Sequence, residues 1–366
     1  MDFSRRLLSW YSINGRDLPW RQFGDPYQIW LSEVILQQTR MEQGIVYFNR
    51  FVRAFPDVFS LARATEQEVL LLWQGLGYYS RARHLHAAAQ HIAVESNGVF
   101  PKTSREWMRL KGVGPYTAAA IASIVSGEVA PALDGNVCRI LSRLFMVDQS
   151  IDSPAGKRIL HDIAIELIDK DQPGAFNQAM MDFGSLVCKP VSPDCFSCIF
   201  RKECLAFGKG KVAQYPVRTR KKKPRARYFR YFFIYMEKAG NGIQFCLRQR
   251  RGEDIWKHLY EWPVVEAEEI TTADKGLFND RWLKKIIPGL STYAVKANPI
   301  HLKHQLTHQT IFADVYLIQA DPSHEGELRK QFRLVDQEEF EALAKPRLIE
   351  LAYEQVMDSL YGRESP

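Results

Sequence analysis

Four cysteines stand close together near the middle of the chain, and their spacing is typical of a metal site. They are Cys188, Cys195, Cys198 and Cys204, in the pattern C-x6-C-x2-C-x5-C. Thiolates grouped in this way usually hold either a [4Fe–4S] cluster or a structural zinc ion. The alternative is a set of buried or disulfide-paired thiols. The spacing therefore predicts a metal-binding module over residues 188–204, with iron–sulfur and zinc both open.

A second pattern, LKGVGPYTA, begins at Leu110 and contains two closely spaced glycines. Gly112 and Gly114 flank Val113 between two stretches of helical character. Two glycines permit a tight turn whose backbone N–H groups approach an anion, and a helix starting near Pro115 points its positive end at the same place. A simple helix-capping turn would explain a lone G-x-G. The longer pattern predicts a helix-hairpin-helix that binds a DNA phosphate.

Two carboxylates are candidates for acid–base chemistry, although each has an ordinary explanation. Glu33 lies in an apolar and amide-rich stretch, Trp30–Arg40. Spacing alone favours the wet face of a helix for Glu33 over a functional role. Asp134 precedes a Gly and an Asn, and an Asp in that position is usually a turn residue. Neither carboxylate identifies a reaction by itself.

The elements that must position these residues are helical over the first part of the chain. A Thr precedes a Glu by three residues at Thr65–Glu68 and at Thr103–Glu106, which is a capping-box pattern. A cap residue stands directly before a proline at Ser153-Pro154. Apolar residues follow each signal, and Gly and Pro separate the segments. These patterns predict an all-α domain over residues 1–217.

The composition changes beyond this helical part. Eight of the thirteen residues from 218 to 230 are Lys or Arg, which is typical of a solvated linker and compatible with phosphate contacts. From Tyr228 the chain is aromatic-rich, and Ile311–Ile318 reads as a central strand. Helical patterns return from about Gln337. We therefore expect a basic linker over 218–227 and a domain of strands and helices over 228–366.

Length and composition limit the class of protein. The chain has 366 residues, of which 46% are hydrophobic, and a formal net charge of +7. This length suffices for two or three domains, and the basic balance favours a polyanionic partner. No apolar run approaches ~18 residues, and the opening residues lack the apolar region of a signal peptide. We expect a protein of a reducing cytosol, without a membrane span.

Six segments occur in an order that resembles a known family. They are WLSEVILQQTR, LWQGLGYYSRAR, LKGVGPYTA, LDGNVCR, FNQAMMDFGSLVC and the four-cysteine pattern. This order resembles the endonuclease III superfamily of helix-hairpin-helix DNA glycosylases, and within it the MutY-type adenine DNA glycosylases, densely over residues 1–215. The resemblance implies a multidomain protein. An all-α glycosylase domain, which carries a [4Fe–4S] cluster rather than zinc, is followed by an α+β Nudix-like (MutT-like) domain.

The resemblance also implies roles for the two carboxylates. Glu33, kept partly protonated by apolar neighbours, would be the general acid that protonates adenine at N7. Asp134, kept ionised, would face the positive charge that develops on the sugar. Tyr116 and Asn136 would orient this pair. Because Tyr116 stands where lyase members of the superfamily carry a nucleophilic Lys, we expect a monofunctional enzyme.

Base-pocket and DNA contacts follow from the same resemblance. The adenine side of the pocket would be lined by Arg16, Trp20 and Arg21, with Gln178 as a further base contact. Leu76 would help to close the pocket, and Gln38 and Tyr78 would wedge the duplex beside the opposite purine. Without the family, Trp20, Leu76 and Tyr78 would be interpreted as ordinary core residues.

The C-terminal domain would read the base opposite adenine. The acidic metal-binding helix of active pyrophosphatases is missing, since Glu266 leads only to Ala267, Glu268 and Glu269, so we expect binding without hydrolysis. The lesion-reading loop of the family is usually Phe-Ser-His. The matching residues are Leu306, Thr307 and His308, in which Thr keeps the hydroxyl and Leu loses the aromatic face. This departure bears on discrimination between 8-oxoguanine and guanine.

Three functional hypotheses follow. The first is removal of adenine opposite 8-oxoguanine and, more weakly, opposite guanine, from double-stranded DNA. The second is an endonuclease III-like glycosylase and AP lyase on oxidised pyrimidines, against which Tyr116 argues. The third is a non-catalytic iron–sulfur DNA-binding protein, against which the two carboxylates argue. For the first hypothesis we expect a monomer in a bacterial cytosol, associated with the nucleoid through its DNA.

Overall fold

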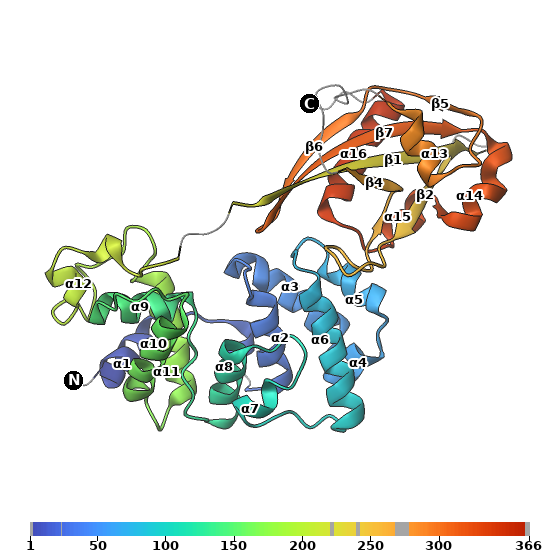
Figure 1. The fold of residues 1–366 in the computed structure, drawn as a ribbon. Helices are drawn as coiled ribbons and strands as arrows, with labels where there is room; N and C mark the ends of the chain where they lie inside the picture. The colour runs from blue at the N-terminus through green and yellow to red at the C-terminus, as the bar shows by residue number, and fades with distance from the viewer. Residues whose placement is uncertain (1–2, 23, 220–222, 239–241, 268–277, 363–366) are drawn as a thin grey trace. The chain divides into compact units, whose positions relative to one another are not determined.

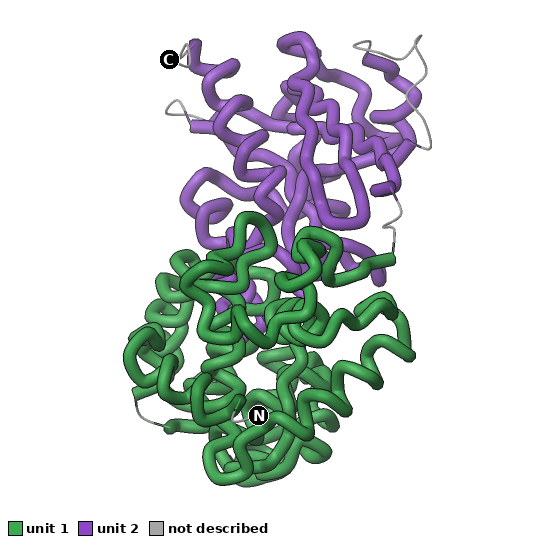
Figure 2. Tube along the Cα trace, turned by 90° about the vertical axis from the view of Figure 1, so that its left-hand side faces the viewer, with its two compact units in different colours: residues 1–64, 84–221 green, residues 65–83, 222–366 purple. Residues whose placement is uncertain are grey.

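The computed structural model describes residues 3–22, 24–219, 223–238, 242–267 and 278–362. The chain divides into two compact units. Unit 1 comprises residues 1–64 and 84–221, and unit 2 comprises residues 65–83 and 222–366 (Figure 2). The expected order of an all-α part followed by an α+β part is confirmed (Figure 1).

The regular elements of unit 1 are all helices over its described residues. Its elements are α1 (Phe3–Asn14), η1 (Pro19–Arg21), α2 (Pro26–Leu36), α3 (Met41–Ala54), α4 (Val58–Arg63), most of α6 (Ser80–Gln90), η2 (His91–Glu95), α7 (Ser104–Trp107), α8 (Pro115–Ser126), α9 (Gly135–Phe145), α10 (Pro154–Leu167), α11 (Pro173–Leu186), α12 (Leu205–Gly208) and η3 (Val212–Gln214). The cap signals predicted two of these starts correctly. Thr103 and Glu106 form a capping box at α7, and Ser153 caps α10.

The core of unit 1 that matters for the site lies between α1, α9, α10 and α11. Phe3 and Leu7 of α1 pack with Leu141 of α9, Leu160 of α10 and Phe183 of α11, all of them buried. The α9 helix contributes Val137, Ile140, Leu141 and Leu144 to this cluster, and its N-cap is Asp134. Packing of α9 therefore fixes where its first turn lies.

Unit 2 combines one helical segment from early in the chain with the C-terminal half. Its elements are α5 (Glu66–Trp73), β1 (Arg225–Glu237), β2 (Ile243–Gln249), β3 (Tyr260–Glu261), β4 (Val264–Ala267), α13 (Asp280–Ile286), β5 (Tyr293–Val295), β6 (Ile300–Gln305), β7 (Gln309–Ala320), η5 (Pro322–His324), α14 (Glu325–Gln331), β8 (Arg333–Val335), α15 (Gln337–Glu341) and α16 (Arg347–Tyr361). The capping box expected at Thr65 and Glu68 is present at the start of α5.

The sheet of unit 2 is mixed and is built around two long strands. β1 and β7 run parallel, with Phe232 opposite Tyr316. The other pairs are antiparallel: β2 and β4 on β1, β5 and β6 on β7, and β3 and β8 on β2. The region Ile311–Ile318 is a central strand, as its two-sided apolar pattern predicted.

Helices cover both faces of this sheet. Phe232 and Tyr316 pack on one face with Leu283 of α13 and Leu328 of α14. On the other face Phe245 contacts the rings of Phe340 in α15 and Tyr353 in α16. Alternate residues of β1 therefore enter two separate cores, which explains why this strand reads as continuously apolar and aromatic.

The boundary between the parts differs in detail from the expectation. β1 begins at Arg225, so the last three residues of the expected linker 218–227 belong to a strand. Residues 65–83 group with unit 2 rather than with the helical part. Residues 220–222 of the linker, and Glu268 and Glu269, lie outside the described residues. Within the described parts, no helix is both long and apolar enough to cross a bilayer.

Candidate active site

Glu33 is buried, which corrects the interpretation that spacing alone favoured. α2 starts at Pro26, after Asp25 accepts a hydrogen bond from the backbone N–H of Tyr27 at 3.0 Å. Eight of the eleven residues of this helix are buried, so the helix has almost no solvent-exposed face. The Glu33 side chain is 8% exposed. The wet-face interpretation failed because α2 is packed on nearly all sides, which a single-face pattern does not reveal.

Glu33 has one neighbour that orients it. The hydroxyl of Tyr116, from the first turn of α8, donates to Oε2 of Glu33 at 3.2 Å and lies 3.1 Å from Sδ of Met181. Burial raises the pKa of Glu33 to about 7; the Tyr116 hydrogen bond opposes this shift, the charge of Asp134 adds to it, and Arg21 opposes it. A carboxyl with such a pKa is partly protonated near neutral pH, as a general acid must be.

Asp134 lies at the N-cap of α9. Its Oδ1 accepts the backbone N–H of Val137 at 2.7 Å, and its Oδ2 accepts Nδ2 of Asn136 at 2.6 Å. Burial raises the pKa of Asp134, and these two N–H donors act against that shift. An ionised carboxylate accepts both bonds, whereas protonation would weaken one of them. The charge of Asp134 is also one of the causes that raise the pKa of Glu33.

Close packing of α9 on α11 holds Asn136 in place. A Cβ added to Gly184 would lie 2.5 Å from Cβ of Asn136, so only glycine fits there. Arg139 donates to Oδ1 of Asn136 at 2.8 Å and to the carbonyl of Gly184 at 2.8 Å. Its Nε donates to the carbonyl of Cys188 at 2.8 Å. The helix that carries Asp134 is thus tied to the start of the four-cysteine segment.

Arg16 and Arg21 share one buried partner that the sequence analysis missed. Asp182 of α11 has no exposed side-chain area. It accepts the backbone N–H and Nε of Arg16, both at 2.9 Å, and the guanidinium of Arg21 at 2.8 and 3.1 Å. Burial alone would raise the pKa of Asp182, but these contacts lower it. The sequence did offer one sign of this partner, because Asp182 is a charged residue within the largely apolar segment FNQAMMDFGSLVC, where a carboxylate needs a buried partner.

Gln178 joins this cluster through Tyr11. The Tyr11 hydroxyl donates to Oε1 of Gln178 at 2.8 Å, and the Arg21 guanidinium lies 5.7 Å from the centre of the Tyr11 ring. Arg21 is in turn one of the charges that act on Glu33. The structure therefore gathers Arg16, Arg21 and Gln178 on the same side of unit 1 as the carboxylates. Trp20 is 6% exposed and packs edge-on against Phe48.

The hairpin before α8 has the geometry that its glycines suggest. Gly112 has φ +80°, and a Cβ there would lie 2.7 Å from Cβ of His84. Gly114 is the N-cap of α8, and Pro115 occupies its first turn. The positive end of α8 therefore points at the hairpin, where a phosphate would be stabilised. Gln38, directly after the end of α2, has φ +58°, an uncommon conformation for that residue.

The four cysteines line one cavity with Arg143, Phe183 and Phe200 around them. Nη1 of Arg143 lies 3.4 Å from Sγ of Cys188, and its Nη1 also donates to the carbonyl of Lys189 at 2.7 Å. None of the described His, Cys, Asp and Glu side chains form a group of three that is close enough to hold a metal ion. The four thiol side chains nevertheless line the same cavity, and thiolates are the donors that an iron–sulfur or zinc group requires.

Unit 2 contains a second candidate site. Leu306, Thr307 and His308 form the tip of the hairpin between β6 and β7, closed by a hydrogen bond from the Leu306 N–H to the Gln309 carbonyl at 2.8 Å. An open pocket of about 460 Å³ lies beside this tip. Its lining includes Leu76, Tyr78, Asp254, Trp256, Gln305, Gln309 and the three residues of the tip.

Tyr78 contacts the expected lesion-reading loop directly. Its hydroxyl shares a hydrogen bond with Oγ1 of Thr307. Tyr78 has φ +47° and Trp256 has φ +60°. Such conformations cost roughly 1–3 kcal/mol each in a non-glycine residue, and they cluster at binding sites. Tyr78, which was expected to wedge the duplex, and the residues expected to read the opposite base thus line one pocket within unit 2, whereas Gln38 belongs to unit 1.

Comparison with known proteins places the two halves in two families. The model described as "HhH-GPD superfamily base excision DNA repair protein" matches residues 31–164, and a NUDIX domain model matches residues 232–355. Among solved structures, a thermostable thymine-DNA glycosylase matches with a TM-score of 0.52 and 26% identity, over 57% of this chain and 95% of its own.

Curated relatives match most of the chain. An adenine DNA glycosylase of Buchnera aphidicola (subspecies Acyrthosiphon pisum) is 34% identical over 317 residues, which is 86% of each chain. The human adenine DNA glycosylase is 40% identical over 213 residues, 56% of this chain and 39% of its own. The helical and NUDIX matches and this coverage lead to one conclusion: the chain belongs to the adenine DNA glycosylase family.

Proposed function

We propose that this protein is a monofunctional DNA glycosylase of base excision repair that removes adenine mispaired with 8-oxoguanine and, more weakly, with guanine. The observation that carries the proposal is the buried pair of Glu33 with Tyr116, electrostatically coupled to Asp134 with Asn136. The names of the curated relatives support adenine as the base.

In the proposed reaction Glu33 donates its proton to N7 of the flipped adenine. The bonding electrons of the N-glycosidic bond then pass to the protonated base, which leaves as neutral adenine. The sugar develops oxocarbenium character, and the Asp134 carboxylate stabilises its positive charge or attacks it as a nucleophile. Water completes the hydrolysis and leaves an abasic site. Tyr116 orients Glu33, and Asn136 orients Asp134.

Arg16, Arg21 and Gln178 form the proposed adenine side of the pocket. Arg16 and Arg21 are held by Asp182, and Gln178 is held by Tyr11. Fixed donors and acceptors of this kind read the edge of an extruded base. Trp20 belongs to this proposal as a lining residue, although it also packs against Phe48. The hairpin glycines Gly112 and Gly114 are proposed to meet a backbone phosphate.

The pocket of unit 2 is the proposed reader of the opposite purine. Thr307 and His308 offer polar groups, Leu306 and Leu76 offer apolar surface, and Tyr78 is the wedge. Gln38, which belongs to unit 1, is proposed to insert into the duplex beside the opposite purine. We propose that this NUDIX-type half binds a base without hydrolysing a pyrophosphate, because the sequence after Glu266 lacks the acidic helix motif.

Cys188, Cys195, Cys198 and Cys204 are the proposed ligands of a [4Fe–4S] cluster. Four thiolates close such a site, so the group would stabilise the loop between α11 and α12 rather than take part in base removal. Zinc is the alternative. Visible absorbance would indicate the iron–sulfur cluster, and elemental analysis would detect zinc. We further propose a monomer that acts on double-stranded DNA at the bacterial nucleoid.

The substrate is tested by single-turnover base release from duplexes that contain 8-oxoguanine:A, G:A and C:A. We expect free adenine, released fastest from 8-oxoguanine:A and slowest from C:A. Absence of adenine release from all three duplexes would overturn the function. Borohydride trapping tests the lyase alternative, since a covalent protein–DNA product reports a Schiff base. We expect no such product at the rate of base release.

A further inference from the structure

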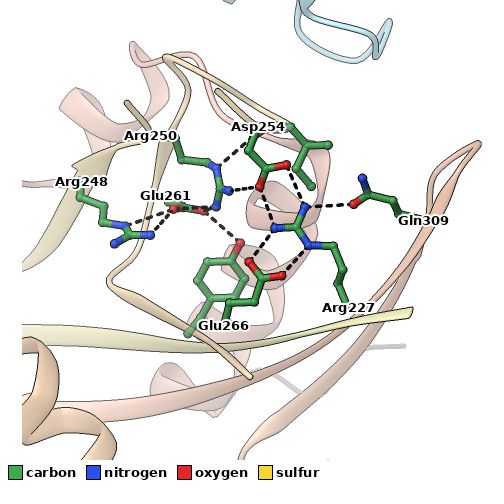
Figure 3. Close-up of polar contacts among 9 residues, drawn as sticks. Arg227, Arg248, Arg250, Asp254, Glu261, Glu266 and Gln309 are labelled. Atoms are coloured by element: carbon green, nitrogen blue, oxygen red, sulfur yellow. Dashed lines mark hydrogen bonds and ion pairs between the residues drawn. The ribbon is translucent and has the colours of Figure 1, made fainter. Parts of the chain in front are cut away.

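Arg227 belongs to the basic run of the sequence, yet it is an internal residue of unit 2. Its side chain is 8% exposed. The guanidinium donates to both oxygens of Asp254 (3.0 and 2.7 Å), both oxygens of Glu266 (2.6 Å each) and Oε1 of Gln309 (3.0 Å) (Figure 3). These contacts use all five of its N–H groups. Arg227 is therefore committed to protein partners rather than to phosphates.

The partners of Arg227 come from three different parts of the domain. Asp254 lies in the loop between β2 and β3, Glu266 lies in β4, and Gln309 begins β7. Two of them, Asp254 and Gln309, line the pocket beside the Leu306–His308 tip, whereas Glu266 does not. The Arg227 side chain thus links two pocket-lining residues, Asp254 and Gln309, to β1.

A second arginine, Arg250, also binds the loop between β2 and β3. Arg250 donates to Asp254 at 3.0 Å, to Glu261 at 3.0 and 2.9 Å, and through Nε to the carbonyl of Ile255 at 3.0 Å. Arg248 completes the cluster with two bonds to Glu261, which has no exposed side-chain area (Figure 3). Three guanidinium groups and three carboxylates leave the cluster without net charge, which compensates its buried members Arg227 and Glu261.

The loop that Arg227 and Arg250 hold is strained. Trp256 and His258 have φ +60° and +67°, a region that costs free energy for residues with a Cβ. Trp256 is 9% exposed, lines the pocket and packs edge-on against Phe229. The surrounding contacts must outweigh that strain for the ring to stay in place.

We propose that Arg227 is a positioning residue for recognition of the base opposite adenine, acting through Asp254 and Gln309. The inference rests on the proposed function of the pocket. It separates Arg227 from its neighbours in the basic run, and it gives β1 a role in specificity. Loss of Arg227 would release Asp254 and Gln309, and with Asp254 the loop that carries Trp256.

The test compares single-turnover adenine release from 8-oxoguanine:A and G:A duplexes for wild type and Arg227→Gln. We expect the ratio of the two rates to fall by about tenfold, the size expected for loss of charge-assisted hydrogen bonds, while the rate on G:A stays near wild type. Arg248→Gln is the matched control, because Arg248 is in the same cluster but does not line the pocket or contact residues that do.

Glu266→Gln is a milder variant that acts through Arg227. It still allows the ratio of rates to be measured if Arg227→Gln does not fold. We expect a smaller loss of the same ratio. An unchanged ratio in the Arg227 and Glu266 variants, or an equal loss in Arg248→Gln, would overturn the inference. A wild type that does not prefer 8-oxoguanine:A would instead refute the proposed reading function, which is a separate result.

Discussion

Glu33 and Asp134 have the same functional group but different surroundings. Glu33 lies on a helix that is buried on nearly all sides and contacts a single hydroxyl, so its charged form is disfavoured. Asp134 accepts two N–H groups, which suit an ionised carboxylate. Burial raises the pKa of both carboxyls, but in Asp134 the two N–H donors act against that shift. Surroundings that treat two carboxyls differently allow one to act as an acid while the other stays charged.

The buried acid makes a prediction about stability. Glu33 has a pKa of about 7 in the folded protein and about 4.3 when unfolded, so its protonated form favours folding below pH 4 and this contribution is lost as pH rises through 7. Glu33→Gln stays neutral, and we expect it to be more stable than wild type at pH 8 by on the order of 3–4 kcal/mol. Urea unfolding across pH measures this. A difference that is independent of pH would contradict it.

Asp182 is expected to matter although it reaches no substrate atom. In Asp182→Asn the two arginines lose a charged partner, so the uncompensated charge of Arg21 should lower the pKa of Glu33. We expect base release to slow by about tenfold or more and the falling limb of its pH profile to move to lower pH. Asp162→Asn, an exposed substitution on α10, is the control. Slower release with an unshifted pH profile would mean that Asp182 is only structural.

At the scale of elements, the parts that the sequence predicted are those with local causes. The starts of α5, α7 and α10 follow from cap residues that contact their own first turns. The position of Glu33 depends on which helices surround α2, and the grouping of residues 65–83 with unit 2 depends on contacts far away in the chain. Arg227 looked like linker because its partners lie 27 to 82 residues further on.

The approach of α11 to α9 gives the element-scale prediction. Gly184→Ala would place a methyl group 2.5 Å from Cβ of Asn136, which forces the helices apart or turns Asn136 away from Asp134. We expect a loss of about 1–3 kcal/mol of stability and slower base release. Gly208→Ala, with nothing within 4 Å of the new atom, should change neither. Equal behaviour of the two variants would show that this close approach is unimportant.

At the scale of the whole molecule, we propose a supporting role for the four-cysteine segment. It is tied to α9 through Arg139, and the carboxylates lie elsewhere in unit 1. We expect Cys198→Ala to lose the proposed metal group, to bind DNA more weakly and to unfold more easily. Cys246→Ala, a buried change in unit 2, should keep the metal. Loss of base removal by a folded, metal-free variant that still binds DNA would contradict a purely supporting role.

The central claim concerns the two carboxylates, and single-turnover release of adenine from an 8-oxoguanine:A duplex tests it most directly. Wild type should slow as pH rises through about 7, where Glu33 loses its proton. Glu33→Gln and Asp134→Asn should each reduce the rate by about a hundredfold or more while still binding the duplex, and the exposed control Glu166→Gln should match wild type. Adenine release at the wild-type rate by both carboxylate variants would contradict the account.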